Sequence, residues 1–158
     1  MKKFAIEIEW GILFIIIALL WTLLEKSLGW HGELIHKHRT YTNFFAIIAI
    51  AVFVFALLDK RKNFYNGKMK WQQGFSTGMF VTLIVAILSP LSQYITHTFI
   101  SPEYFTNVIA HTVEHEKLTQ EAAEAYFNLK NYIFQSILGG VIMGVITSAI
   151  VALFVRKK

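Results

Sequence analysis

Apolar residues in this chain are gathered into four long runs, which short polar segments separate. The first two runs cover about residues 8–28 and 41–58, and the last two cover about 74–98 and 131–155. A helix of ~20 residues rises ~30 Å, which is the thickness of the hydrocarbon core of a bilayer. The runs are apolar all round, unlike the one-sided stripe of a water-facing helix. The pattern therefore predicts an all-α integral membrane bundle of four transmembrane helices, with residues 1–158 forming one domain.

The first run follows two lysines, as the apolar core of a secretory signal peptide would. However, Glu7 and Glu9 interrupt the charged start, and no small-x-small cleavage site follows Leu24. We therefore expect the first run to be retained as a transmembrane helix.

The polar segment between the third and fourth runs, about residues 101–130, predicts an external helical connection. Ser101, Pro102 and Glu103 form the pattern of a helix start, with a capping serine and a proline in the first helical position. Thr119 is predicted to cap a second external helix, which leads into the fourth span. An extra helical segment is thus expected outside the membrane.

The distribution of positive charge predicts the orientation of the bundle. Ten of the fifteen Lys and Arg residues flank the two termini and the connection between the second and third runs. They are Lys2, Lys3, Lys60, Arg61, Lys62, Lys68, Lys70, Arg156, Lys157 and Lys158. Because positively charged loops stay in the cytoplasm, we expect both termini inside. The same basic connection contains Asn66-Gly67, a pair that favours the positive φ angles of a tight reversal.

Composition narrows the class of protein. Hydrophobic residues make up 55% of the chain and charged residues only 16%, whereas soluble domains carry ~25% charged residues. The chain has no cysteine, which excludes disulfides, thiolate metal sites and cysteine nucleophiles. The net charge of +5 arises beside the apolar runs rather than on a separate basic domain, so the lipid bilayer, and no nucleic acid, is the expected partner.

Small residues recur at helical spacing in the third and fourth runs. The candidate packing positions are Gly74, Gly78, Gly140, Gly144 and Ser148. Small side chains let helix backbones approach closely in lipid, as in the GxxxG pattern. The stripes therefore predict helix packing, either within one bundle or between copies, with lining of a pore or pocket as the alternative.

Polar residues near Pro90 predict a cleft in the outer half of the bundle. Pro90 frees a backbone carbonyl four residues earlier, and Ser89 is placed to help satisfy it. The candidate cleft residues are Ser89, Gln93, Thr96, His97, Gln135 and Ser136, with Thr22 and Glu25 at similar depth. These side chains either form a binding site or bond to one another and fix the register of the helices.

All six histidines fall on the predicted outer face, where a divalent metal or a pH change could act on them. His111, Glu114 and His115 match the HxxEH pattern of zinc peptidases. Nothing else in the chain would build a peptidase cleft, so we expect no catalysis and no cofactor, and His111 and His115 are only weak metal candidates.

Several segments together resemble a known family. They are residues 66–78, the Pro102-Glu103-Tyr104-Phe105 segment, the Thr119-Gln120-Glu121 helix start and the closing Arg156-Lys157-Lys158. Over nearly its whole length the chain resembles bacterial membrane proteins of Domain of Unknown Function family 4199. The resemblance implies a bacterial origin and the four-span layout, and it supplies no catalytic residue.

Two functions are consistent with these observations. No charged residue falls near the middle of a run, which disfavours ion-coupled pumping. The favoured hypothesis is a non-enzymatic protein of the bacterial inner membrane that acts through helix packing, with itself or with a membrane-protein partner. The alternative is a small channel, transporter or ligand-binding membrane protein that uses the outer polar cleft near Pro90.

Overall fold

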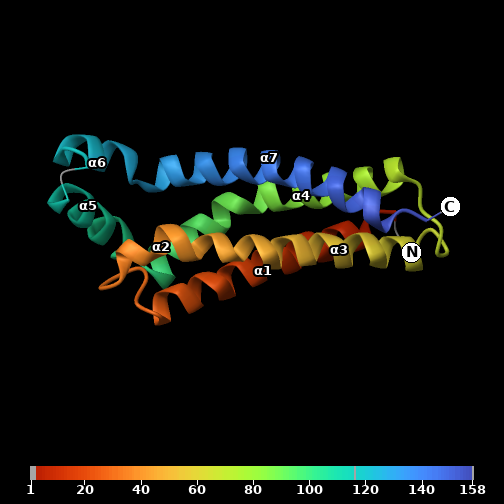
Figure 1. Ribbon diagram of the computed structural model, residues 1–158, viewed down its shortest axis with the longest axis horizontal. Helices are drawn as coiled ribbons and strands as arrows, with labels where there is room; N and C mark the ends of the chain where they lie inside the picture. Colours follow the sequence, from red (N-terminus) through yellow and green to blue (C-terminus); the bar gives the residue numbers. More distant parts are fainter. Residues whose placement is uncertain (1–2, 116, 158) are drawn as a thin grey trace.

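The computed structural model describes residues 3–115 and 117–157 as a bundle of helices that run along one long axis (Figure 1). The four principal helices are α1 (Ala5–Ser27), α3 (Phe45–Asn63), α4 (Trp71–Ile95) and α7 (Leu129–Val155). In this part of the chain, four helical stretches are long and apolar enough to cross a membrane. The prediction of an all-helical fold with four such helices is confirmed.

Two of the spanning stretches are longer than their apolar runs. The short helix α2 (Ile35–Tyr41) and the turn η1 (Thr42–Phe44) continue into α3, and the second spanning stretch therefore begins at Ile35. The helix α4 continues through Pro90 into the π-helical turn η2 (Thr96–Ile100). Pro90 leaves the Ala86 carbonyl without its helical N–H donor. The Ser89 hydroxyl donates to the carbonyl of the preceding residue, Val85 (2.8 Å). Helical backbone thus extends past the ends of the hydrophobic pattern.

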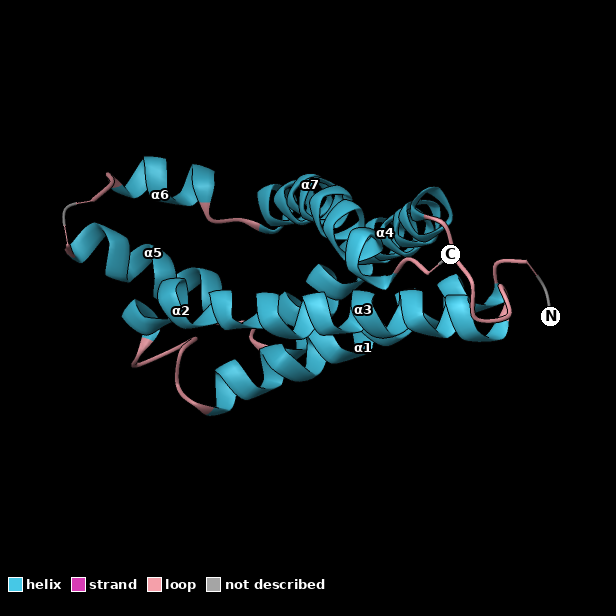
Figure 2. Cartoon of the chain, turned by 45° about the vertical axis from the view of Figure 1, so that its right-hand side comes forward, coloured by secondary structure: helices cyan, strands magenta, loops and turns pink. Residues whose placement is uncertain are grey.

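The external connection contains α5 (Tyr104–Glu114) and α6 (Gln120–Tyr126), which lie at the opposite end from the termini (Figures 1 and 2). Thr119 caps α6 as predicted, since its side-chain oxygen accepts from the Ala122 N–H (3.3 Å). The predicted helix start at Ser101 is wrong, because α5 begins at Tyr104 and has no side-chain cap. The Ser101 hydroxyl instead lies 3.0 Å from Nδ1 of His31, and this long-range partner replaces the local capping bond.

The connection between α3 and α4 closes the other end of the bundle. Asn66 and Gly67 have φ angles of 52° and 86°, which confirms the predicted reversal. Met69 and Lys157 exchange two backbone hydrogen bonds of 2.8 and 2.9 Å, which tie this connection to the C-terminal segment. The two termini lie at this same end of the bundle (Figure 1).

A buried ion pair joins α1 to α3 near this end. The Lys60 ammonium lies 2.9 Å from the Glu7 carboxylate and also donates to the Lys3 carbonyl (2.6 Å). Both charged side chains are almost completely buried. A second bond links the same two helices, since the Trp10 indole N–H donates to Asp59 (2.7 Å).

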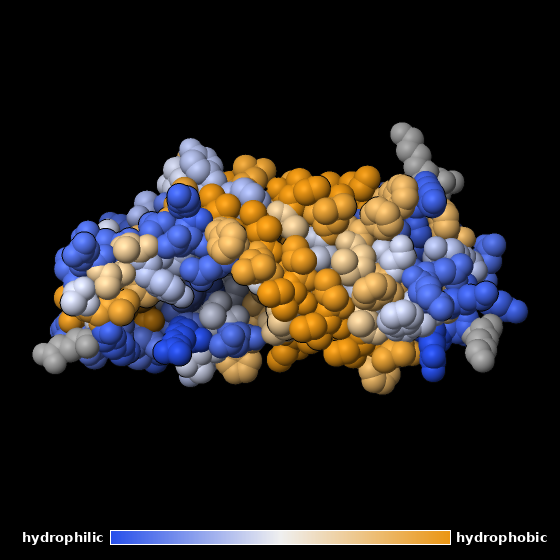
Figure 3. All heavy atoms as spheres, turned by 90° about the horizontal axis from the view of Figure 1, so that it is seen from above, coloured by the Kyte–Doolittle hydropathy of each residue, from blue (hydrophilic) through white to orange (hydrophobic). Residues whose placement is uncertain are grey.

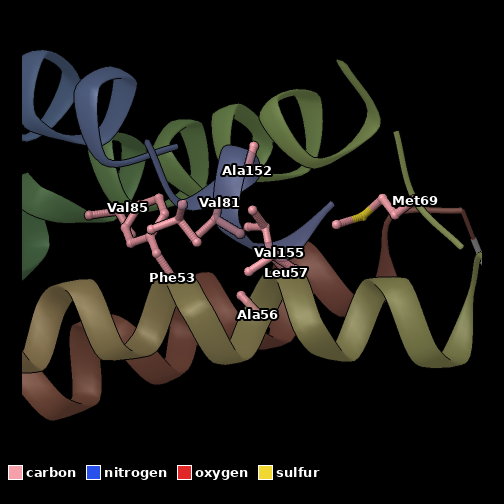
Figure 4. Close-up of a cluster of buried hydrophobic side chains, with 9 residues drawn as sticks. Phe53, Ala56, Leu57, Met69, Val81, Val85, Ala152 and Val155 are labelled. Atoms are coloured by element: carbon pink, nitrogen blue, oxygen red, sulfur yellow. The ribbon is translucent and has the colours of Figure 1, made fainter. Parts of the chain in front are cut away.

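The core packs between α3 and the α4–α7 pair (Figure 4). Its buried members are Phe53, Ala56, Leu57, Met69, Val81, Val85, Val151, Ala152 and Val155. The small residues bring α4 and α7 together: a Cβ built on Gly78 would lie 2.6 Å from Ser148 Cβ, and one on Gly144 would lie 2.9 Å from Thr82 Cβ. A Cβ on Gly74 would meet Ala152 at 3.1 Å, whereas one on Gly140 meets nothing within 4 Å. Four of the five candidate packing residues thus contact the facing helix of the same chain.

On the face that Figure 3 shows, apolar side chains form a broad belt across the middle, between polar ends. Large apolar residues of the spanning helices are open to the surroundings, for example Ile47 (67% exposed) and Phe154 (83% exposed). Such an extensive exposed apolar surface is stable in contact with lipid. The fold is that of a multi-pass membrane protein, and the cytoplasmic location of the termini stays a prediction.

Candidate metal centre and adjoining cavities

A carboxylate and two imidazoles meet near the end of the bundle that carries α5 and α6. Glu25 comes from the last turns of α1, His31 from the loop after it, and His38 from α2. Oε2 of Glu25 lies 3.4 Å from Nε2 of His31 and 3.5 Å from Nε2 of His38. One ligand atom from each of the three residues lies within 4.8 Å of the others. Glu25 and His31 are buried and His38 is half-buried.

The end of α1 positions two of these groups. Gly29 takes a φ of 77°, its N–H donates to the Lys26 carbonyl (2.9 Å), and the Trp30 N–H donates to the Glu25 carbonyl (3.0 Å). This is the hydrogen-bond pattern of a Schellman motif, for which glycine is favoured because the left-handed conformation is strained for other residues. The chain turns back at Gly29, and His31 follows immediately beside the last turn of α1.

Neighbouring groups contact the second polar atom of each side chain, which is Oε1 in Glu25 and Nδ1 in His31 and His38. The Trp21 indole N–H donates to Oε1 of Glu25 (2.7 Å). Nδ1 of His31 lies 3.0 Å from the Ser101 hydroxyl, and Nδ1 of His38 lies 3.3 Å from the Tyr104 hydroxyl. Burial, together with the nearby Tyr132, raises the pKa of Tyr104, so this hydroxyl is neutral near neutral pH. Partners of this kind orient metal ligands in proteins, and here they leave three inner atoms directed at one another.

The two separations between Glu25 and the histidines are close to those around a divalent metal ion. Tetrahedral zinc has bonds of ~2.0–2.1 Å to nitrogen and oxygen, which places neighbouring ligand atoms ~3.3 Å apart. Ordinary N–H···O hydrogen bonds have a mode of ~2.9–3.0 Å. The observed 3.4 and 3.5 Å are closer to the edge of a metal tetrahedron than to a hydrogen bond. A carboxylate with two imidazoles is also a donor set that zinc and related metals accept.

The three residues line a cavity of about 250 Å³, which we call the outer cavity, and it also contains part of the predicted polar cleft. Gln93, Thr96 and His97 are in its wall. Nε2 of His97 lies 3.2 Å from Oε1 of Gln93, and since an amide oxygen only accepts, Nε2 is the donor. Nδ1 of His97 is then an acceptor, and it is buried without a partner among the described residues. The outer cavity therefore holds an unsatisfied polar atom beside the carboxylate–histidine cluster.

The remaining predicted cleft residues are distributed over other cavities. Ser89 and Ser136 line an inner cavity of about 270 Å³, and Gln93 lies in the walls of both the inner and the outer cavity. Gln135 lines a separate external pocket beside α5 and α6. The structure thus brings Gln93, Thr96 and His97 together around the cluster and places Gln135 elsewhere.

The HxxEH residues are outside the cluster. The rings of His111 and His115, on α5 and the turn after it, are tilted by 45° with their centroids 4.2 Å apart. The ring centroid of His36 lies 6.4 Å from that of His111. Desolvation, together with the nearby His115 and Lys117, lowers the pKa of His111. Within the described ranges, the group of three metal-capable side chains is Glu25, His31 and His38, not the HxxEH set.

Sequence reasoning placed Glu25 beside the cleft and all six histidines on one face, but it did not combine them. The available signal was Gly29, which marks a helix end just after Glu25 and just before His31. The contribution of His38, and the roles of Trp21 and Ser101, depend on contacts between distant segments.

A bundle of four apolar helices with a buried carboxylate–histidine cluster near one end defines a multi-pass membrane protein with a candidate metal centre. The chain belongs to the family described as Protein of unknown function (DUF4199), which matches residues 9–157. No curated protein and no solved structure matches the chain.

Proposed function

We propose that this protein binds a divalent transition-metal ion through Glu25, His31 and His38 at the external face of the bacterial cytoplasmic membrane. The observation that carries the proposal is the convergence of Oε2 and the two Nε2 atoms, while the second polar atoms of the same side chains contact neighbours. The proposed function is ligand binding, and no catalytic step is part of the proposal.

One tautomer of the two imidazoles favours a cation between them. The Ser101 and Tyr104 hydroxyls can each accept a hydrogen bond from Nδ1 of the neighbouring histidine. In that tautomer both Nε2 atoms present lone pairs towards a carboxylate, and three lone pairs that share one small space repel one another. A metal ion removes this repulsion because it accepts all three lone pairs.

Charge along the molecule supports the external location of the site. The termini and the α3–α4 connection, where Lys and Arg are concentrated, lie at the end of the bundle opposite α5 and α6. With that basic end in the cytoplasm, the cluster faces the outer side. The outer cavity of about 250 Å³ leaves room for a fourth ligand, such as water or a solute group.

A bound ion would connect the end of α1 to α2. Both Glu25 and His38 belong to spanning stretches, and His31 lies in the loop that joins them. The ion would therefore stabilise the external end of the bundle, by ~2.7 kcal/mol when the free metal is 100-fold above its Kd.

The full chain, purified in detergent with an affinity tag other than polyhistidine, provides the test. Calorimetry should show one high-affinity Zn²⁺ site per chain, and Zn²⁺ should raise the thermal unfolding temperature by several degrees. His38→Ala and Glu25→Gln should each weaken Zn²⁺ binding by about 10- to 100-fold. His36→Ala is the matched control, because His36 lies on the same helix α2 but outside the cluster, and it should bind Zn²⁺ like the wild type.

Equal loss of Zn²⁺ binding in His36→Ala and His38→Ala, or saturation of the wild type only at millimolar Zn²⁺, would refute the proposal. Metal analysis of protein purified without added zinc provides an independent measurement, and the expected content is one metal ion per chain.

Self-association through the small-residue stripes is not part of this proposal. Gly78 and Gly144 already contact Ser148 and Thr82 across the α4–α7 interface of one chain. These two positions of the stripes are therefore occupied within one chain.

A further inference from the structure

The outer and inner cavities are neighbours, and together they mark a path from the candidate metal centre into the middle of the bundle. They share wall residues from α1, α3 and α4, namely Ala18, Phe45, Ser92 and Gln93. Beyond this shared wall, the inner cavity extends along α7, where Gly140 and Gly144 lie in its wall.

The inner cavity is more apolar than the residue types in its wall suggest. Three hydroxyl side chains in its wall already donate to backbone carbonyls of their own helices. Thr82 donates to Gly78 (2.9 Å) and Ser89 to Val85 (2.8 Å). Ser136 donates to Ile133 (2.8 Å). With these hydrogens engaged, the wall presents mainly hydrocarbon, including Phe14, Phe53 and Met143.

The outer end of the same path is polar and able to bind an anion. A divalent ion on one carboxylate and two neutral imidazoles leaves a net positive charge. Nδ1 of His97 is buried without a partner among the described residues and can accept a hydrogen bond from a ligand. The path therefore changes from polar to apolar over its length.

We infer that the two cavities connect and that this path is a binding site for a long-chain amphiphile, with its anionic oxygen head at the metal centre and part of its hydrocarbon chain in the inner cavity. The inference rests on the proposed function for the head, and on the cavity wall alone for the chain. A cavity of ~150 Å³ with apolar walls is large enough to bind benzene, and the inner cavity has about 270 Å³. The cavity also lies between membrane-spanning helices, where hydrocarbon chains are the surrounding medium.

Two adjacent glycines provide a matched pair of variants. A Cβ on either Gly139 or Gly140 would meet nothing within 4 Å, so both positions accept a side chain. Gly140 lines the inner cavity and Gly139 is not among its wall residues. Gly140→Leu should fill the cavity, whereas Gly139→Leu should leave it open.

The probe is 9,10-dibromostearate, whose bromine atoms quench tryptophan fluorescence, and Trp21 in the wall of the outer cavity is the reporter. With the full chain in detergent and saturating Zn²⁺, Gly140→Leu should weaken the saturable quenching by about 10-fold or more, and Gly139→Leu should match the wild type. If Gly140→Leu and Gly139→Leu bind the probe equally, the chain site is refuted.

The metal dependence separates this inference from the proposed function. Removal of Zn²⁺ by a chelator, or the substitution His38→Ala, should weaken probe binding about 5-fold or more. If Zn²⁺ binds but probe affinity does not change with Zn²⁺, the assignment of the head to the metal is refuted while the proposed metal site stands. If Zn²⁺ does not bind but Gly140→Leu still blocks the probe, the proposed function and the assignment of the head fail, and the chain site stands.

The source of the amphiphile is tested with dibrominated phosphatidylglycerol in lipid nanodiscs. Quenching that Gly140→Leu abolishes and Gly139→Leu preserves would identify a membrane phospholipid as the ligand. If only the free fatty acid shows this dependence, a free carboxylate amphiphile is the ligand. If neither probe shows it, the inference is refuted.

Discussion

The two glycines of the GxxxG pattern should respond in opposite directions to the same substitution. A Cβ built on Gly144 would lie 2.9 Å from Thr82 Cβ and closer still to its hydroxyl and methyl groups, whereas a Cβ on Gly140 would meet nothing within 4 Å. Gly144→Ala therefore forces α4 and α7 apart, and Gly140→Ala only adds a methyl group to a cavity wall.

The magnitude follows from two terms. Carbon atoms in contact are normally ~3.5–4.0 Å apart, so Thr82 must move by more than half an ångström. Its side chain is β-branched, and its hydroxyl donates to the Gly78 carbonyl (2.9 Å), so it cannot rotate away freely. Overpacking of this kind costs ~1–3 kcal/mol. Alanine is also favoured over glycine within a helix by ~0.5–1 kcal/mol, which stabilises Gly140→Ala, but both variants share this gain and it cancels in their comparison. The two variants should therefore differ by the overpacking cost, about 1–3 kcal/mol in unfolding free energy.

Reversible unfolding in mixed detergent and SDS micelles, followed by far-UV circular dichroism, measures this difference. Gly78→Ala is a second test of the same interface, because its Cβ would lie 2.6 Å from Ser148 Cβ, and it should be destabilised like Gly144→Ala. Equal stability of Gly144→Ala and Gly140→Ala would refute the close approach of α4 and α7 at Gly144.

Two further predictions concern the end of the bundle that carries the termini. Lys60→Met should destabilise the protein by ~3–5 kcal/mol, because it leaves the buried Glu7 carboxylate without its partner. The double variant with Glu7→Gln should recover part of this loss, and thermal unfolding of the wild type and of these two variants measures both effects. Burial and the nearby Glu7 raise the pKa of Tyr65, so the stability that its protonated form contributes is complete below the unfolded pKa of ~10 and declines as pH rises beyond it. Wild type should therefore lose more stability than Tyr65→Phe between pH 9 and pH 11, and parallel losses in the two proteins would contradict this assignment.

Local signals in the sequence predicted the fold well wherever neighbouring residues decide the structure. Asn66-Gly67 forms the expected reversal because its positive φ angles depend on these two residues. Thr119 caps α6 because its partner is three residues away. Ser101 has the same local pattern, but a distant partner, His31, takes its hydroxyl, and the predicted helix start is displaced.

The candidate site was only partly predictable for the same reason. Gln93, Thr96 and His97 share one helical face, so their common location follows from helical periodicity. The cluster of Glu25, His31 and His38 instead requires the chain to turn back at Gly29, just after α1, and α2 to bring His38 beside Glu25. Periodicity within one helix carries no information on that packing.

The sequence by itself determined four helices that are long and apolar enough to cross a membrane, because the exclusion of water from hydrocarbon acts on each run independently of the others. It also determined the reversal at Asn66-Gly67, which is a local backbone preference. Only the tertiary structure decided that Gly144 packs against Thr82 while Gly140 faces a cavity, since the two glycines are equivalent in the sequence pattern. It also decided which histidines meet Glu25, because in lipid every helix face is equally apolar and close packing between particular helices selects the partners.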